Sequence, residues 1–258
     1  MHTKYEYALK GRTKMQNIWL TLEYDGTRYL GWQRPIRNNA ARTVSYKLSE
    51  VLRRMTGESP ILNCAAKTEP GVHALAQEVS FQTSCTASPE DFVQYLNTYL
   101  PQDIAIRRAC QMPERFRADL NAKSRTYIYH LCILPVQDIF KRQYALHQFP
   151  CPDAALMQQA AMPLIGKHDF KYFASGHTKK NTKKELFDIQ IDTTPEKISL
   201  TLTADDFLPK MPRLIIGTLL DIGLGIRRKD TVESVLTGVQ APSLPCDPKG
   251  LFLKHVFY

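Results

Sequence analysis

The sequence lacks several features that would assign it to a membrane, secreted or metal-binding class. No apolar run comes near the roughly 20 residues that a membrane-spanning helix needs. Residues 1–7, MHTKYEY, contain no apolar core of the kind that a secretory signal has. The six cysteines include no C-x-x-C pair, and the seven histidines are scattered, so neither a disulfide framework nor a metal site is expected. These absences predict a protein of the reducing cytoplasm.

The sequence also has fewer negatively than positively charged residues. Lys and Arg number 34 against 25 Asp and Glu, which gives a formal net charge of +9. The excess is clustered at residues 53–54, 107–108, 141–142, 179–180, 183–184 and 227–229. For any one cluster a solvated face is the favoured interpretation, but six together favour a phosphate-bearing partner such as nucleic acid.

The length of 258 residues suits one large domain or two of roughly 100–150 residues each. In the first half, residues 18–24 alternate apolar and polar side chains, as a half-buried strand does. Thr43 is a plausible N-cap for a helix with its apolar stripe at residues 44–55. Residues 88–91, SPED, resemble a capping box that opens a second helix.

The second half repeats this style. Strands are expected at residues 127–133 and 251–258, and a strand pair at residues 186–191 and 198–204. A helix is expected at residues 153–165, where Pro163 would kink it or end it early. Further helices are expected at the apolar segment 214–220 and after Asp230, which would cap a short helix together with Glu233. Interleaved helices and hairpins predict an α+β fold rather than a doubly wound parallel sheet.

A division into two halves follows from this order of elements. We expect an N-terminal half at residues 15–112 and a C-terminal half at residues 113–258, with the boundary near Pro113. Residues 1–14 precede the first strand, and Met15 lies close to that strand. They are interpreted as an N-terminal extension or as a misassigned start.

The least ordinary segment is residues 65–74, AAKTEPGVHA. It carries Lys67, Glu69 and His73 beside a proline and a glycine, in a loop that leads into a strand, where catalytic groups are often placed. Taken alone, the segment favours a surface loop with an incidental ion pair over a catalytic loop.

Six blocks of sequence decide between these interpretations. They are residues 24–33 (YDGTRYLGWQ), 66–73 (AKTEPGVH), 116–122 (FRADLNA), 125–129 (RTYIY), 168–170 (HDF) and 207–219 (FLPKMPRLIIGTL). In this order they resemble the motifs of the TruA-type tRNA pseudouridine synthases, whose active-site loop reads G-R-T-D-x-G-V-H. The resemblance runs from about residue 17 to residue 258.

The resemblance implies a pseudouridine synthase fold, in which two α+β halves with antiparallel or mixed sheets flank a basic active-site cleft. It implies isomerisation of a uridine in the anticodon arm of tRNA, after the uridine has been flipped out of the stack. The bond from base N1 to the ribose breaks, the base rotates, and C5 rejoins the sugar. It also implies a homodimer and no cofactor, and it places Arg28 and Arg125 in contact with RNA.

The same resemblance assigns roles within the cleft. Glu69 occupies the position of the catalytic carboxylate, either as nucleophile or as proton acceptor. Tyr127 would stack on the flipped base, and Arg213 would pair with the carboxylate and orient it. Lys67 takes the place of an arginine that helps to hold the substrate open.

This chain departs from the family pattern inside that cleft. Glu69 replaces an aspartate, and its extra methylene moves the carboxylate by roughly 1–1.5 Å, where a misplacement of about 1 Å can cost on the order of 100-fold in rate. Lys67 lacks the planar fork of arginine. Asp119 places a negative charge where the family has a positive one. Pro209 and Pro212 alter the approach to Arg213, and Pro212 is expected to hold Met211 extended.

Three functional hypotheses therefore stand. The first is an active tRNA pseudouridine synthase with a refitted site. The second is a catalytically impaired paralogue that binds RNA without isomerising it. The third is C-glycoside chemistry on another substrate, such as a free nucleotide.

Overall fold

The computed structural model describes residues 15–33, 39–176 and 181–258 of the chain. The expected extension at residues 1–14 and the Lys179-Lys180 cluster lie outside these residues. Within them, no helix combines the length and the apolar character needed to cross a membrane.

Ten strands form one mixed sheet, with the main order β4-β1-β3-β10-β5-β9-β8-β7. The strands are β1 (Gln16–Tyr24), β2 (Asn63–Cys64), β3 (His73–Thr83), β4 (Ile104–Met112), β5 (Ser124–Cys132), β6 (Leu146–His147), β7 (Gly166–Asp169), β8 (Lys183–Thr193), β9 (Lys197–Ala204) and β10 (Leu251–Phe257). Most neighbours are antiparallel, but β3 and β10 pair in parallel, as do β5 and β6. The strands of both halves thus belong to a single sheet, and the predicted α+β class is confirmed.

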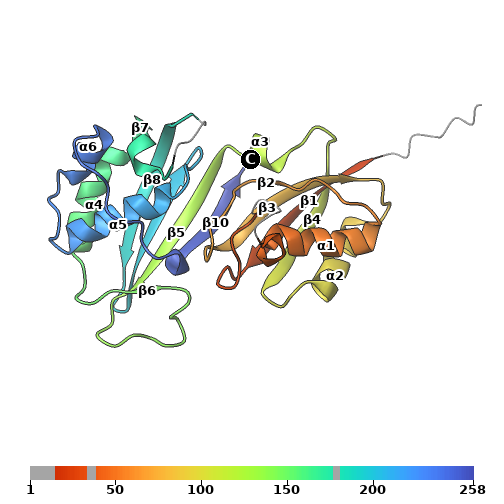
Figure 1. Ribbon diagram of the computed structural model, residues 1–258, viewed down its shortest axis with the longest axis horizontal. Coiled ribbons are helices and arrows are strands. Elements are labelled where there is room, and N and C mark those ends of the chain that lie inside the picture. The colour runs from red at the N-terminus through yellow and green to blue at the C-terminus, as the bar shows by residue number, and fades with distance from the viewer. Residues whose placement is uncertain (1–14, 34–38, 177–180) are drawn as a thin grey trace, which may run out of the picture.

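Helices α1 (Val44–Thr56) and α2 (Pro89–Tyr99) cover the N-terminal half of the sheet (Figure 1). Thr43 caps α1 by accepting a hydrogen bond from the Tyr46 amide, and Gly57 ends it at φ 73°. Ser88 and Asp91 form the predicted capping box of α2. Phe92 of α2 is fully buried and meets Phe81 of β3 edge to face at 5.7 Å, so α2 packs its apolar stripe against the sheet.

Helices α4 (Ala154–Ala161), α5 (Met211–Gly223) and α6 (Thr231–Leu236) form the second helical group. Pro163 ends α4 as predicted, because it lies in a 3-10 turn over Met162–Leu164. Helix α5 is buried on nearly all sides, as its composition indicates. The predicted cap of α6 is wrong: the Asp230 side chain caps no backbone amide, because its carboxylate pairs instead with Arg228 at 3.2 Å.

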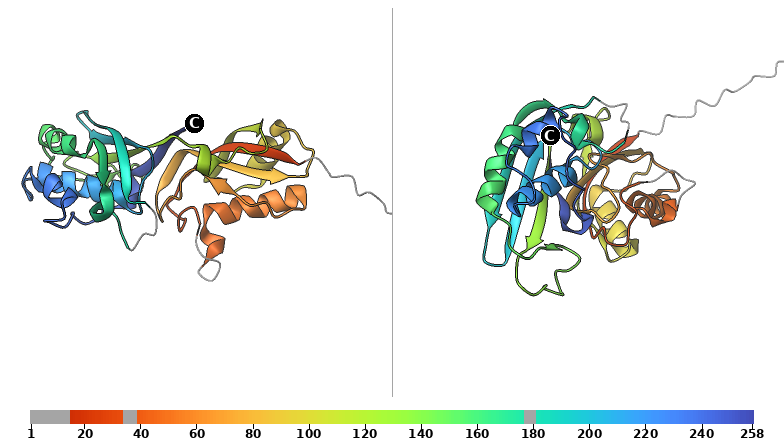
Figure 2. Two further views of the ribbon diagram at one scale, coloured as in Figure 1. Left: turned by 90° about the horizontal axis from the view of Figure 1, so that it is seen from above. Right: turned by 60° about the vertical axis from the view of Figure 1, so that its left-hand side comes forward.

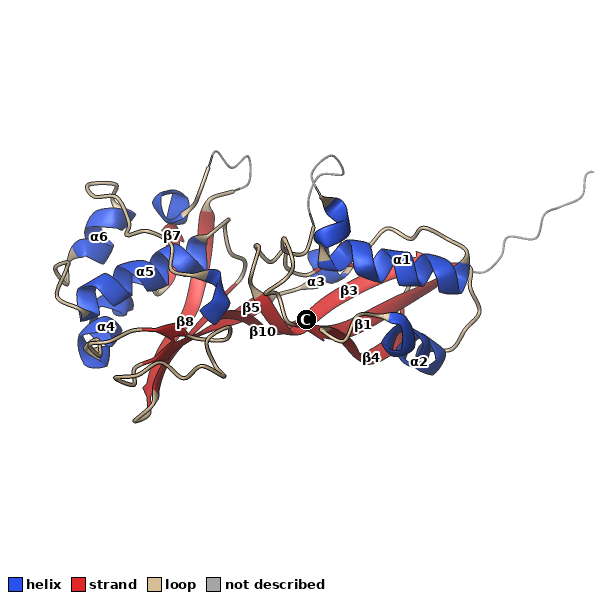
Figure 3. Ribbon diagram, turned by 60° about the horizontal axis from the view of Figure 1, so that its bottom comes forward, coloured by secondary structure: helices blue, strands red, loops and turns tan. Residues whose placement is uncertain are grey.

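The two helical groups lie at opposite ends of an elongated molecule (Figure 2), and the strands run as one band between them (Figure 3). Strand β10, the last of the chain, joins the halves: it pairs with β3 at His73 and Ala74 and with β5 along most of its length. The loop that ends at His73 therefore enters the sheet at the junction of the halves. The short helix α3 (Ala118–Asn121) lies at the same junction, against β2 and β3.

A carboxylate is buried within the N-terminal half of the sheet. Glu78 of β3 is only 4 % exposed, and the Thr21 hydroxyl of β1 donates to its carboxylate oxygens at 2.9 and 3.1 Å. Burial raises the pKa of Glu78 from 4.5 to about 7, although Thr21 and Arg108 oppose the shift. The folded chain therefore binds a proton at Glu78 that the unfolded chain has already released in the pH range between 4.5 and 7.

This difference predicts a pH-dependent stability. The contribution of protonated Glu78 to the free energy of unfolding is fully present below pH 4.5 and is lost as the pH rises through about 7. Glu78→Gln has no group that titrates at this position. From pH 5 to pH 8 the free energy of unfolding of the variant, relative to that of the parent, should therefore rise by about 2 kcal/mol. Urea unfolding at both pH values measures this, with Glu114→Gln on the exposed surface as control. Parallel pH profiles for the parent and Glu78→Gln would contradict the prediction.

Candidate active site

The loop at residues 65–73, which we call the carboxylate loop, is held in place by the turn that follows β1. The Trp32 amide donates to the Thr68 carbonyl at 3.0 Å, and the Gly71 amide donates to the Tyr29 carbonyl at 3.2 Å. Gly31 has a φ of 87°, and a Cβ on it would lie 2.5 Å from the Thr68 carbonyl oxygen. The first two matched blocks therefore pack directly on each other.

Buried polar side chains fix the same loop from within. The Gln77 amide group donates to the Ala66 carbonyl at 2.6 Å and accepts from the Ala66 amide at 3.3 Å. The Tyr24 and Thr68 hydroxyls are 2.7 Å apart. At the end of the loop His73 Nδ1 accepts from the Gly26 amide at 3.0 Å. These contacts leave little freedom in the loop backbone, so the direction of the Glu69 side chain is determined by the fold.

Glu69 reaches from this loop to the start of α5. Its Oε2 accepts from Arg213 Nη1 at 2.6 Å, and its Oε1 accepts from the Lys210 amide at 3.0 Å. Arg213 is held in turn, because its Nε donates to the Cys246 carbonyl at 2.6 Å. The side chains of Glu69 and Arg213 are 22 % and 12 % exposed. The pairing that the resemblance implies is present, and each carboxylate oxygen has its own donor.

The backbone at the start of α5 adopts the conformation that this contact needs. Lys210, the N-cap, has φ 62° and ψ 3°, which is uncommon for a residue other than glycine. The expectation that Met211 is extended is wrong: Met211 is the first residue of α5, and Pro212 lies in the first turn. Proline is tolerated there because amides of the first turn have no partner within the helix. The positive end of the helix dipole therefore faces the Glu69 carboxylate.

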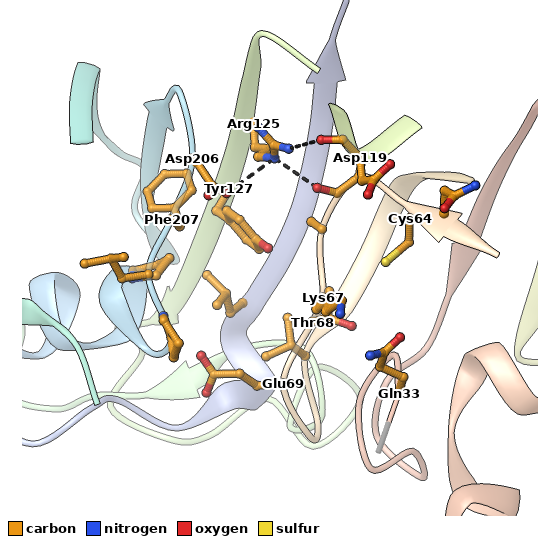
Figure 4. Close-up of a pocket in the computed structure, with 18 of the residues that line it drawn as sticks. Gln33, Cys64, Lys67, Thr68, Glu69, Asp119, Arg125, Tyr127, Asp206 and Phe207 are labelled. Carbon is orange, nitrogen blue, oxygen red and sulfur yellow. Dashed lines mark hydrogen bonds and ion pairs between the residues drawn. The ribbon is translucent and has the colours of Figure 1, made fainter. Parts of the chain in front are cut away.

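Glu69 lies at one end of a cavity of about 690 Å³ at the junction of the two halves (Figure 4). The cavity is lined by the carboxylate loop, α3 and its approach, β5, and the segment before α5. Its lining includes Gln33, Asn63, Cys64, Lys67, Thr68, Glu69, Arg117, Asp119, Leu120, Arg125, Tyr127, Asp206, Phe207, Leu208 and Pro212. Within the described ranges, no three His, Cys, Asp or Glu side chains are grouped so that they could hold a metal ion.

Tyr127 of β5 lies in the middle of the cavity wall. Its side chain is 7 % exposed, and its ring meets Phe207 edge to face at 5.2 Å. Burial raises the pKa of Tyr127, and the nearby Glu69 carboxylate adds to the shift, so the phenol stays protonated at neutral pH. No described group forms a hydrogen bond with its hydroxyl. A flat, rigid ring with an available hydroxyl suits an aromatic base.

Arg125 lies at the other end of the cavity from Glu69 (Figure 4). Its guanidinium donates to the carbonyls of Ala65, Asp205 and Asp119 at 3.0, 2.6 and 3.3 Å. The Asp206 carboxylate lies 3.6 Å away and also pairs with Lys184 at 3.1 Å. Arg125 thus ties together three segments of the cavity wall, in addition to contributing its charge.

The remaining predicted residues lie at different distances from the cavity centre. Lys67 is exposed on the cavity lining, and no described carboxylate forms an ion pair with it. Asp119 lies on the lining and is paired with Arg117 at 2.8 Å. Arg28 does not line the cavity: its side chain is 75 % exposed and pairs with Asp103 at 2.6 Å.

Comparison with known proteins agrees with this geometry. A family model described as tRNA pseudouridine synthase matches residues 21–120 and 160–258. A curated tRNA pseudouridine synthase A of Clostridium botulinum is 36 % identical over 247 residues, which cover 95 % of this chain and all of the relative. A tRNA pseudouridine synthase A 2 of Clostridium perfringens is 36 % identical over 95 % of this chain and 100 % of the relative. The corresponding protein of Bacillus anthracis is 32 % identical over 94 % of this chain and 99 % of the relative.

The chain belongs to the tRNA pseudouridine synthase family. Three features of this synthase-family site were not expected from its sequence. The Lys210 amide contacts Glu69 through its backbone, and no side-chain pattern signals such a contact. Asp206 lines the cavity directly before the matched block 207–219, where a carboxylate adjacent to the motif offered a weak signal. Gln77 is fully buried in β3, and no sequence pattern indicated that its side chain would hold the carboxylate loop.

The Glu69–Arg213 pair should contribute to the stability of the fold as well as to the site. Arg213→Met leaves a partly buried carboxylate and the Cys246 carbonyl without their charged donor, so we expect a loss of about 2–3 kcal/mol in the free energy of unfolding. Urea denaturation measures the loss. Arg228→Met breaks the Arg228–Asp230 ion pair, in which both side chains are exposed, and should leave the unfolding midpoint unchanged. Equal losses of unfolding free energy in the two variants would show that the Glu69–Arg213 contact stabilises the fold no more than an exposed ion pair does.

Proposed function

We propose that the chain isomerises uridine to pseudouridine in tRNA and that its target lies in the anticodon arm. The observation that carries the proposal is the Glu69 carboxylate, fixed by Arg213 and the Lys210 amide at the end of a cavity that also presents Tyr127. Family membership supports the reaction class. The cavity volume of about 690 Å³ suits one nucleotide extruded from an RNA strand.

The geometry supports a division of work among these residues. The flipped uracil stacks on Tyr127, whose hydroxyl is available to a polar atom of the base or ribose. Glu69 then acts at the sugar, as nucleophile or as proton acceptor, while the N1 bond breaks and the base rotates within the cavity. Arg213 keeps the carboxylate aimed and does not need to touch the substrate. The two donors on Glu69 hold it in one orientation throughout, so little reorganisation accompanies reaction.

RNA binding in this proposal depends on cations outside the reacting centre. Lys67 is the lining cation without an ion-pair partner among the described residues, so it is placed to contact the phosphate or ribose of the target strand. Arg125 acts mainly by holding the cavity wall, since backbone carbonyls occupy its donors. Arg28, exposed on the turn that supports the carboxylate loop, would contact RNA beyond the cavity. By resemblance to the family, we propose a homodimer that acts in the cytoplasm.

The first prediction from this proposal concerns the carboxylate. Glu69→Ala should abolish tritium release from tRNA labelled at uridine C5, because no other cavity group can replace the carboxylate at that position. Glu69→Asp should lower the rate by about 100-fold, since Arg213 and the Lys210 amide hold the longer side chain and an aspartate stops short of them. Binding of tRNA should be unchanged in both variants, which is the control for folding.

The same assay tests the alternative of an impaired paralogue. A parent protein with no release above background, together with a Glu69→Asp variant that gains activity, would favour the paralogue and contradict the proposal.

A further prediction concerns the substrate. Phosphate contacts release counterions, so the affinity for tRNA should fall steeply as salt rises, and Lys67→Ala should reduce the slope of log Kd against log salt by about 1. Lys167→Ala, on the edge strand β7, should leave the slope unchanged. Turnover of a free nucleotide with no salt-dependent binding of tRNA would instead support C-glycoside chemistry on a small substrate.

A further inference from the structure

Leu120 is the one large hydrophobic side chain on the cavity lining, among the described residues, that is mostly exposed. Val72, Leu208 and Leu251 line the cavity but are 1–2 % exposed, because their side chains also pack into the core. Leu120 of α3 lines the same cavity and is 70 % exposed. Single exposed leucines are common on protein surfaces, so its exposure alone assigns no role.

The backbone that carries Leu120 is held unusually firmly for such a short helix. The Ala118 amide donates to Ser80 Oγ of β3 at 2.9 Å, and the Ala118 carbonyl accepts from the Tyr258 hydroxyl at 3.0 Å. Arg125 of β5 donates to the Asp119 carbonyl at 3.3 Å. Side chains from two strands and from the last residue of the chain thus fix the two residues before Leu120.

The approach to α3 is anchored in the same way. Asn17 of β1 is 3 % exposed, and its amide group donates to the carbonyls of Pro113 and Phe116 at 2.8 and 2.9 Å. Phe116 packs against the rings of both Trp19 and Tyr258, at centroid distances of 5.5 and 5.3 Å, and those two rings also meet each other at 5.2 Å. Because this backbone is held by hydrogen bonds and packing, the exposed Leu120 side chain can contact a ligand without displacement of α3.

The surroundings of Leu120 indicate what that ligand is. Asp119 is paired with Arg117, so the polar neighbours of Leu120 satisfy each other. Lys67 and Gln33, on the lining formed by other segments, are exposed. An apolar contact bordered by polar groups on the lining of a nucleotide-sized cavity matches the face of a base with its backbone nearby.

We propose that Leu120 is an apolar wedge that stacks on the base next to the target uridine and fills the space that this uridine leaves when it enters the cavity. The inference rests on the proposed function, because it assumes an RNA strand at the cavity. Extrusion of a base costs stacking and pairing energy, and an inserted apolar side chain offsets part of that cost. The benefit of Leu120 should therefore be largest where the target uridine is paired in a stem.

Two RNA stem-loops test this, one with the target uridine paired and one with the same uridine opposite a mismatch, where extrusion costs less. At saturating protein, Leu120→Ala should lower the single-turnover rate on the paired target by about tenfold and on the mismatched target by less than about twofold. Leu120→Met should restore the rate on the paired target. Leu244→Ala, at a side chain that is 87 % exposed and does not line the cavity, is the matched control.

If Leu120→Ala lowered the single-turnover rate equally on both RNAs, or on neither, the wedge proposal would be wrong. A change in oligomeric state on Leu120→Ala, with equal losses on both RNAs, would instead place Leu120 between two copies of the chain and would also overturn it.

A binding measurement keeps this test independent of turnover. With 2-aminopurine next to the target uridine in the paired stem-loop, saturating parent protein should raise the fluorescence, because insertion of Leu120 separates the probe from its neighbour. Leu120→Ala should give less than half of that increase at equal occupancy. Equal fluorescence in the two proteins would overturn the wedge even if neither turns over, whereas a fluorescence difference without turnover would contradict only the proposed reaction.

Discussion

The contact between Glu69 and the start of α5 is the constraint on which the site depends. It joins residues 144 positions apart in the chain, and it crosses from the N-terminal to the C-terminal half of the sheet. Arg213 and the Lys210 amide each hold one carboxylate oxygen, so a rotation of one half against the other would break two hydrogen bonds to a charged group. The geometry of the carboxylate is therefore coupled to the packing of the two halves.

The sheet makes this coupling rigid. Strand β10 lies between β3 and β5, and those two strands carry the end of the carboxylate loop and Tyr127. The parallel pairing of β10 with β3 covers only two residue pairs, yet it occurs at His73, where the loop enters the sheet. Burial lowers the pKa of His73, opposed by the nearby Asp25 carboxylate, so the imidazole stays neutral and accepts the Gly26 amide. His73 is thus a structural hydrogen-bonding group of the loop.

Local structure was largely predictable from the sequence, because its signals are local. Thr43 and the Ser88–Asp91 box cap the predicted helices, and the alternation in residues 18–24 lies within β1. The Glu69–Arg213 pair could be expected only through resemblance to a family, since nothing in the spacing of the two residues brings them together. The positive φ of Lys210 and the hydrogen bond from Tyr258 to α3 arise from tertiary packing, so no sequence pattern indicated them.

The carboxylates on the cavity lining, including the unexpected negative charge of Asp119, are each paired with a cation. The negative charge of Asp119 is matched by Arg117, and that of Asp206 by Arg125 and Lys184. Of the charged side chains on the cavity lining, three are cations and three are carboxylates, and Lys67 alone among these six has no ion-pair partner in the described residues. A lining whose carboxylates are each paired suits an uncharged uracil, and in the proposed complex the exposed Lys67 would meet the phosphates outside. The negative charge that Asp119 adds therefore leaves no unpaired carboxylate on the cavity lining within the described residues.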